Sequence, residues 1–435
     1  MFILENSKEL TDERLADFIE KHKQLVAERF QKLKDAYMTE YDIMKMQKKD
    51  SWKPDNRIAV NFAKYITDTM NGFFIGHPIK FSVEGGDENV TKFVEFIDQY
   101  NDQDDSNAEL SKLCSMFGRG YEIYYLDSLA NQCIMPVSVM DGFMIYDESI
   151  VARPRFFVRL YMDTDKLLHG SVSDDKVVKY FTKPGDIVWD NGEYPDGKPH
   201  GYDGVPATEF RENEERVGIY EPVMSMIDAY NKAISEKAND VDYFADAYLK
   251  ILGPNVDKES QKQIRSNRII NFKGQNAEKM VVEFLSKPDG DTSQEHLIDR
   301  LEKLIFQISM VANISDENFG SSSGIALKYK LQAMSNLAKT KERKFISGLN
   351  RRYRIIFSNP ANLVPSDDWV KLHFHFTQNY PANITEEIEN AKNLEGMVSK
   401  ETQLKLLSIV EDAQAEIERL KNEDADYREQ MGVDM

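Results

Sequence analysis

Cysteine is nearly absent from this chain of 435 residues. Its two cysteines, Cys114 and Cys133, are too few and too far apart for a zinc site, and no CxxC pair occurs. These absences exclude zinc-finger and dithiol redox proteins. We expect both residues to act as small apolar side chains in a reducing compartment, with a disulfide possible only if the fold brings them together.

Long apolar runs are also absent. No stretch approaches the roughly 18 consecutive apolar residues that a membrane-spanning helix needs. The first ten residues lack a basic segment followed by an apolar core, so we expect no secretory signal. With 41% hydrophobic and 30% charged residues the composition is that of a folded globular protein. The length predicts two or more subdomains, since it exceeds one ordinary core.

Signatures of chemistry are missing as well. Segment 320–324 is rich in Gly and Ser, but Ile and Ala follow it instead of the Lys-Ser or Lys-Thr of a phosphate loop. GxGxxG, HExxH and GxSxG motifs do not occur. His373 and His375 would share one side of a strand without an evident third ligand, so we interpret them as ordinary strand residues. Acid pairs such as Asp104 and Asp105 lie in hydrophilic stretches, where carboxyl pKa values stay ordinary. We therefore expect no catalytic residue, no metal and no cofactor, and predict that the protein is not an enzyme.

Positive charge is scarce, and the net charge is −19. This balance argues against a protein that coats nucleic acid, but not against one that DNA slides past. Segment 328–354 is the exception: with one acid, Glu342, it carries +8, which leaves −27 for the rest of the chain. The segment could pair with the protein's own acidic surface or turn a face toward a polyanion. Its nine basic residues are Lys328, Lys330, Lys339, Lys341, Arg343, Lys344, Arg351, Arg352 and Arg354.

Apolar residues at helical spacing predict most of the chain to be helical. The predicted helices cover 11–49, 57–74, 90–100, 108–117, 217–252, 293–313, 325–357 and 385–431. Stretches rich in β-branched and aromatic residues predict strands over 79–83, 121–126, 156–162, 177–181, 269–272, 280–285 and 369–377. Gly, Pro and Asp predict a long loop over 191–206 and a turn over 287–290. The expected fold class is α+β, mainly helical.

The helix predicted over 293–313 has an unusual second half, because residues 304–314 carry no charge. We expect that half to be buried, either in a core or between subunits. Its apolar stripe consists of Leu297, Leu301, Leu304, Ile308 and Val311. A polar loop with one aromatic residue, Phe319, separates it from the basic helix.

Four segments, in this order and spacing, resemble the portal proteins of siphophages. They are NRIAVNFAKYITDTM at 56–70 with Gly76-His77-Pro78, EPVMSMIDAYN at 221–231, GIALK at 324–328, and GMVSKET at 396–402 with the acidic positions Glu411, Asp412 and Glu416 after it. The resemblance extends over nearly the whole chain. It implies a portal architecture with long stem and wing helices.

The resemblance assigns each part of the chain to a part of that architecture. Residues 1–215 and 325–385 would form the wing, 216–252 and 292–313 the two stem helices, 253–291 the clip, 314–324 the tunnel loop and 386–435 the crown. The stripe on 293–313 would then pack between neighbouring stem helices. The residues expected to meet DNA are Asp316, Glu317, Asn318, Phe319, Gly320, Ser321, Ser322, Ser323, Gly324, Lys328 and Lys330.

The function that the resemblance implies is a ring of about twelve copies at one capsid vertex, through which DNA is packaged and ejected. The implied partners are further copies of the chain, double-stranded DNA, the terminase large subunit, the major capsid and scaffolding proteins, and head-completion (adaptor) proteins. No membrane is involved; the ring would assemble in the host cytoplasm and remain in the virion. Two alternatives stay open: a DNA-binding protein that uses the basic helix 328–354, and another capsid-assembly factor such as a scaffold.

Overall fold

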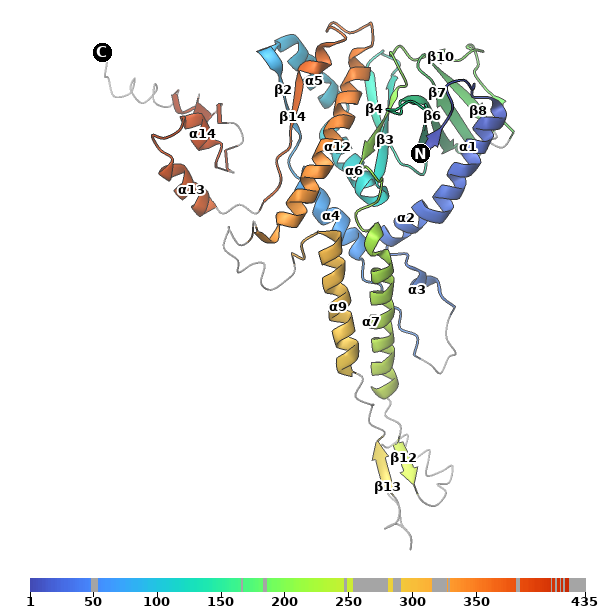
Figure 1. Ribbon diagram of the computed structural model, residues 1–435, viewed down its shortest axis with the longest axis vertical. Helices are drawn as coiled ribbons and strands as arrows, with labels where there is room; N and C mark the ends of the chain where they lie inside the picture. Colours follow the sequence, from blue (N-terminus) through green and yellow to red (C-terminus); the bar gives the residue numbers. More distant parts are fainter. Residues whose placement is uncertain are drawn as a thin grey trace.

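A mixed α/β body carries two long helices that project from it side by side, with a small sheet at their far end (Figure 1). A short helical unit lies beside the body. The computed structural model describes residues 1–47, 54–165, 167–182, 186–245, 249–252, 281–284, 291–314, 327, 329–380 and 384–407, and in the tail 409–410, 413–414, 416–417 and 419–421. The expected α+β class, mainly helical, is confirmed.

The helices of the described residues fall into three groups. Those of the body are α1 (Asp12–Leu25), α2 (Gln31–Tyr37), α3 (Asp42–Lys45), α4 (Phe62–Ile75), α5 (Glu88–Tyr100), α6 (Gln103–Phe117) and α12 (Gln332–Phe357). The projecting pair, here called the helical hairpin, is α7 (Met224–Ala245) and α9 (Asp291–Ser309). The unit beside the body contains α13 (Ile384–Asn393) and α14 (Lys400–Leu404).

The strands of the described residues form four sheets. The largest has the order β1-β5-β6-β7-β8-β10, with β9 also on β8, and only its β1–β5 pair is parallel. Its strands are β1 (Phe2–Ile3), β5 (Gly142–Tyr146), β6 (Pro154–Met162), β7 (Leu168–Ser173), β8 (Val177–Thr182), β9 (Val188–Trp189) and β10 (Lys198–Pro199). The second sheet joins β11 (Ala207–Arg211), β3 (Arg119–Leu126) and β4 (Gln132–Val137). Two further pairs are β2 (Lys80–Val83) with β14 (Leu372–His375) and β12 (Leu249–Leu252) with β13 (Val281–Phe284).

The first predicted helix starts where expected and ends early. The hydroxyl of Thr11 accepts a hydrogen bond from the N–H of Arg14 and caps α1. A π-helical turn, Val26–Phe30, links α1 to α2, which ends at Tyr37. Thr39 then adopts a positive φ of 67°, and the chain turns. The prediction of one helix over 11–49 is therefore wrong beyond Tyr37.

The second helix begins five residues later than predicted, because residues 56–60 are held extended against α7. The N–H of Asn56 donates to the Oδ1 atom of Asn239 over 2.6 Å. The N–H of Ile58 reaches the Oγ atom of Ser235 over 2.9 Å, and that of Val60 reaches the Oδ1 atom of Asn231 over 2.8 Å. The contacting residues are four apart on α7, a rise of about 6 Å, and two apart in segment 56–60, a rise of about 6.7 Å, so the two spacings match. These contacts, here called the side-chain ladder, take the place of a neighbouring strand.

The hairpin differs from the prediction at one end. The helix predicted over 217–252 is α7, which begins after a 3₁₀ turn and ends at Ala245. Leu249–Leu252 is not its last turn but strand β12, paired antiparallel with Val281–Phe284. Over only a few residues, the spacing of apolar side chains cannot distinguish the last turn of a helix from a short strand.

Most other predicted elements are confirmed with shifted ends. Helices α5, α6 and α9, and strands β2, β3, β6, β8, β13 and β14, lie within or across the predicted ranges. The 325–357 helix is found as α12, and the described part of the tail contains the short helices α13 and α14 and further helical residues within 413–421. The loop predicted over 191–206 is largely confirmed, apart from β10, although Tyr202 and Val205 are buried. The strand predicted over 269–272 and the turn over 287–290 lie outside the described residues.

Three apolar clusters hold the body together. The largest joins α2, α4, α6 and α12 to β3 and β11, and extends to the first turns of α7 and to α9. A second lies between α5, the end of α12 and β14. The third packs α1 against the large sheet, with Phe143 and Ile145 in its centre. The hairpin is thus anchored in the same core as α12.

Candidate functional site

The helical hairpin is joined by polar contacts along its length and by apolar ones near the body. Lys237 of α7 pairs with Glu295 of α9, and the side-chain amide of Gln294 donates to Asp240 over 3.2 Å. Near the body the ring of Phe306 meets Phe62 edge-on at 5.7 Å between centroids. These contacts fix α9 against both α7 and α4.

The apolar stripe predicted on α9 is divided between the core and the surface. Val311 is buried, and Leu301 and Leu304 are half-buried. Leu297 and Ile308 remain 52% and 46% exposed in the single subunit. The deepest contacts of α9 come instead from Ile298 and Ile305, one position further along the helix. The helix α9 is thus apolar on more than one face, and the predicted packing of the stripe between subunits stays a prediction.

The uncharged segment 304–314, which extends past the end of α9 at Ser309, consequently leaves an apolar surface open. Met310 and Ile314, besides Ile308, are exposed there. The N–H of Ile314 donates to the hydroxyl of Tyr65, which holds the end of this segment against α4. An exposed apolar stripe along a projecting helix is typical of a surface that another subunit covers.

The residues predicted to meet DNA are mostly not described. Residues 316–324 and Lys328 lie outside the described part of the chain. Lys330 is exposed just before α12. The described chain leaves α9 at Ile314 and returns at Leu327, so that the segment connects α9 to α12.

The basic residues of α12 have two different environments. Three of those that face the body pair with acids of the same chain, while Arg351 donates to the carbonyls of Val205 and Ala207. The ammonium of Lys341 lies 2.8 Å from the carboxylate of Glu212 and is fully buried. Lys344 pairs with Glu214, and the guanidinium of Arg352 pairs with Glu122. For these three residues, pairing with the protein's own acidic groups is the correct interpretation.

Arg352 is the most deeply buried of these cations. Its guanidinium also donates to the side-chain oxygen of Asn107 over 2.6 Å. Burial alone would lower the pKa of Arg352, but the adjacent carboxylate of Glu122 raises it above its ordinary value. Arg352 is therefore a permanent charge inside the body, and Glu122 is its counter-ion.

A second buried cluster joins the body to the start of the hairpin. Arg216 donates through two nitrogens to the carboxylate of Glu209, each over 2.8 Å. Burial would raise the pKa of Glu209, but Arg216 lowers it below its ordinary value. Arg29 of the π-helical turn donates to the carbonyl of Arg216 and to the carboxylate of Glu221, which opens the 3₁₀ turn before α7. The entry to α7 is thus fixed by charge as well as by packing.

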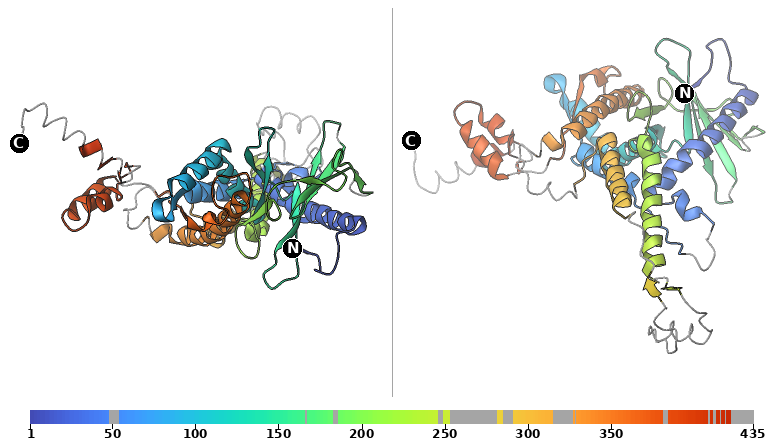
Figure 2. Two further views of the ribbon diagram at one scale, coloured as in Figure 1. Left: turned by 90° about the horizontal axis from the view of Figure 1, so that it is seen from above. Right: turned by 60° about the horizontal axis from the view of Figure 1, so that its bottom comes forward.

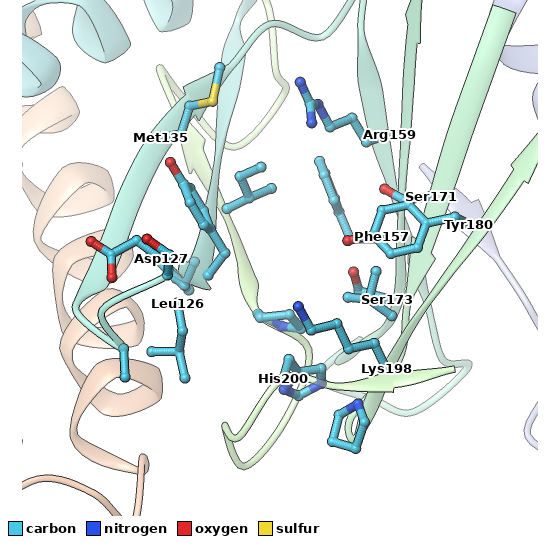
Figure 3. Close-up of a pocket in the computed structure, with 18 residues that line it drawn as sticks. Leu126, Asp127, Met135, Phe157, Arg159, Ser171, Ser173, Tyr180, Lys198 and His200 are labelled. Carbon is cyan, nitrogen blue, oxygen red and sulfur yellow. The ribbon is translucent and has the colours of Figure 1, made fainter. Parts of the chain in front are cut away.

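A cleft of about 550 Å³ lies between the two sheets of the body (Figure 3). The second sheet contributes Tyr125 and Met135, and the large sheet contributes Arg159 and Tyr180. The carboxylate of Asp127 accepts hydrogen bonds from the hydroxyl of Tyr100 and from the N–H groups of its own turn. The bond from Tyr100 lowers the pKa of Asp127.

Two further polar side chains of the cleft, His200 and Arg159, also have contacts. The Nδ1 atom of His200 accepts from the N–H of Tyr202, and its Nε2 atom lies 3.2 Å from the carbonyl of Asp174. Burial lowers the pKa of His200, so its ring is neutral. The guanidinium of Arg159 lies 4.9 Å from the ring centre of Tyr161. These contacts stabilise the sheets and turns around the cleft.

The two histidines of β14 have ordinary contacts. His375 is hydrogen-bonded to the hydroxyl of Ser82 over 2.9 Å, and His373 lies 3.8 Å from Glu84. Among the described residues no cluster of three or more His, Cys, Asp or Glu could hold a metal ion. Cys114 and Cys133 are both free thiols, the first fully buried. Within the described part of the chain, no helix has the length and apolar character to cross a membrane.

A body with a projecting helical pair and an uncovered apolar stripe is the shape of a subunit built for assembly. The family model described as "Phage portal protein, SPP1 Gp6-like" matches residues 16–430. The chain therefore belongs to the SPP1 Gp6-like family of phage portal proteins. Members of this family are structural and non-enzymatic, form oligomeric rings and are components of the virion.

Two portal proteins of phages are similar to this chain over most of its length. The chain is 22% identical to the portal protein of Bacillus phage SPP1 over 423 residues, which covers 91% of this chain and 81% of that protein. It is 21% identical to the portal protein of Clostridium phage phiCD119 over 401 residues, covering 84% and 86%. A solved chain from the neck of an empty GTA particle aligns with a TM-score of 0.40 and 10% identity over 79% of this chain and 89% of that chain.

Proposed function

We propose that this portal protein forms a ring of about twelve copies at one capsid vertex, and that DNA is packaged and ejected through its centre. The observation that carries the proposal is the helical hairpin, which projects from the body and leaves Leu297 and Ile308 uncovered. Apolar side chains on one face of a helix are stabilised when a neighbouring copy covers them.

The parts of the chain would then have distinct tasks. We assign the wing to 1–215 and 325–385, the stem to 216–252 and 292–313, the clip to 253–291 and the crown to 386–435. The first stem segment ends in strand β12, whose partner β13 lies within the clip range, so the helical part of the stem is α7 and α9 alone. The clip would dock the terminase large subunit and later the head-completion proteins, while the wing would contact the major capsid and scaffolding proteins.

The tunnel loop, 314–324, would reach toward DNA. Its connection from α9 to α12 supports this role, because both helices belong to the main core and hold its ends. Residues 316–324, with Lys328 and Lys330, are the positions proposed to meet the duplex. Replacing Lys328 and Lys330 with Ala should alter DNA packaging or retention and leave rings intact; normal packaging and retention would contradict the role of these two lysines.

The direct test of the ring is imaging of the purified protein by negative-stain electron microscopy. Rings with a central hole are the expected result. A compact monomer that binds a short DNA duplex would contradict the proposal and favour a DNA-binding role for segment 328–354. Against that alternative, Lys341, Lys344 and Arg352 are already paired with acids of the same chain.

A further inference from the structure

Long buried side chains of α12 reach the inner face of α6, and the opposite faces of both helices are exposed. The ammonium of Lys341 donates to the carbonyl of Ser111 and to the hydroxyl of Ser115, over 3.0 and 2.6 Å. Arg352 donates to Asn107. All of these contacts are buried, so they define which side of each helix faces the other.

The outer face of α12 is basic. Lys339 and Arg343 are each two residues from Lys341, and Arg354 is two residues from Arg352, so they point about 160° away from the inner contacts. All three side chains are exposed. The one acid of the helix, Glu342, is half-buried at its flank. We call Lys339, Arg343 and Arg354 the basic face.

The outer face of α6 is acidic. Asp105 and Glu109 are each two residues from Asn107 and point away from α12 by the same reasoning. Asp104 and Asp105, in the first turn, are exposed, as is Glu109, which pairs with Lys112 one turn on. Three acids against one base leave this side negative. We call Asp104, Asp105 and Glu109 the acidic face.

The basic and acidic faces lie on opposite sides of the body. Seen from above, in the left panel of Figure 2, α12 runs along one broad side and the blue-to-cyan helices α5 and α6 along the other. A closed ring of more than two copies uses heterologous contacts, in which two different surfaces of one chain meet. Opposite charges on opposite sides are what such a contact requires.

We propose that the basic face of each subunit docks on the acidic face of the next, and that this contact sets the direction in which subunits join. The inference rests on the ring of the proposed function and adds to it the surfaces that meet in the body. It also explains why three cations of an acidic chain stay exposed while their neighbours on α12 are buried in ion pairs.

The test uses two full-length variants. In each variant the basic face and the acidic face are given the same sign of charge. The first is Lys339→Glu/Arg343→Glu/Arg354→Glu, and the second is Asp104→Lys/Asp105→Lys/Glu109→Lys. In 0.1 M salt each alone should give at least about tenfold fewer rings than the wild type, since like charges then face each other. An equal mixture of the two should restore rings, because every contact in an alternating ring again joins opposite charges.

Native mass spectrometry reads both the ring yield and the alternation of the two variants. A matched control, Lys23→Glu/Lys176→Glu/Lys198→Glu, changes the net charge equally on α1, the β7–β8 turn and β10, and should form rings normally. Thermal unfolding checks that each variant is folded. Normal rings from either variant alone, or no rings from the mixture of two folded variants, overturn the inference. If the wild type itself forms no rings, the proposed function fails instead.

Discussion

The Nε atom of Arg352 lies 2.9 Å from a carboxylate oxygen of Glu122, and both side chains are almost completely buried. Replacing Arg352 with Met should lower the free energy of unfolding by about 3–5 kcal/mol, because it leaves a buried charge without a partner. Replacing Glu122 with Met in the same chain should recover most of that loss, since neither charge then remains. Urea unfolding of the single and double variants measures both changes.

The control for this pair is on the same helix. Arg354 is exposed, and Arg354→Met should change the free energy of unfolding by no more than about 0.5 kcal/mol. If the double variant is as unstable as Arg352→Met alone, the loss comes from packing or from Asn107, and the ion-pair explanation is wrong.

His22 gives the body a dependence on pH. Its ring packs 4.7 Å from that of Phe143, and burial lowers its pKa to about 4 from an ordinary 6.5. As pH falls from 6.5 to about 4 the unfolded chain binds the proton while the folded chain does not, so stability present above pH 6.5 is lost through that window. The full loss is about 3 kcal/mol.

The measurement is the difference in unfolding free energy between wild type and His22→Phe at several pH values. The difference should shift in favour of the variant as pH falls through the window, because Phe takes no proton. His77 is exposed, and His77→Gln should show no such shift. A constant difference between wild type and His22→Phe would show that His22 does not titrate in this way.

Gly118 and Gly72 allow a matched test of how the fold tolerates an added methyl group. Gly118 follows α6 with φ +82°, and a Cβ atom there would lie 2.1 Å from the carbonyl oxygen of Arg216. Gly118→Ala should therefore destabilise the fold by about 2 kcal/mol or more. Gly72 lies on the exposed side of α4, where an added Cβ atom would meet nothing within 4 Å, and Gly72→Ala should stabilise by about 0.5–1 kcal/mol. Thermal unfolding compares the two; equal effects would contradict the geometry at Gly118.

Variants of α9 distinguish apolar residues needed for ring assembly from those needed for folding of the subunit. Leu297→Asp and Ile308→Asp should reduce ring formation with little change in thermal unfolding of the subunit, because both side chains are exposed in the single chain. Ile305→Asp should lower stability by several kcal/mol, since Ile305 is buried in the main core. Gln307→Asp is the control at an exposed polar position and should leave rings intact. Normal rings from Leu297→Asp and Ile308→Asp would exclude these residues from the subunit contact.

Local sequence patterns predicted the features that depend on residues close together in the chain. The start of α1 after Thr11 and the ends of α4 and α6 before glycine lie within one residue of the predicted ranges, because residues close in the chain determine them. Strands β4, β5, β7 and β11 were missed because their stability comes from pairing with strands elsewhere in the chain. The ion pairs of α12 join residues up to 230 positions apart, so the sequence predicted its charge but not which cations are buried.

The side-chain ladder was the least predictable feature, although it has a signal. Asn231, Ser235 and Asn239 recur every fourth residue on a helix whose other inward positions are apolar. Polar residues at that spacing share one face, and three of them in a row indicate a polar partner for that face. What the sequence does not reveal is that the partner is the backbone of residues 56–60.

The ladder also determines how the chain bears load. Its three contacts lie in a row parallel to the axis of α7. Tension along that axis therefore loads all three hydrogen bonds at once, and no single one breaks first. A pull across the axis would peel them apart one at a time. Segment 56–60 leads directly into α4, so axial tension on α7 passes through the ladder into the core of the body. Single-molecule pulling along α7 should thus meet far greater resistance than pulling at right angles to it.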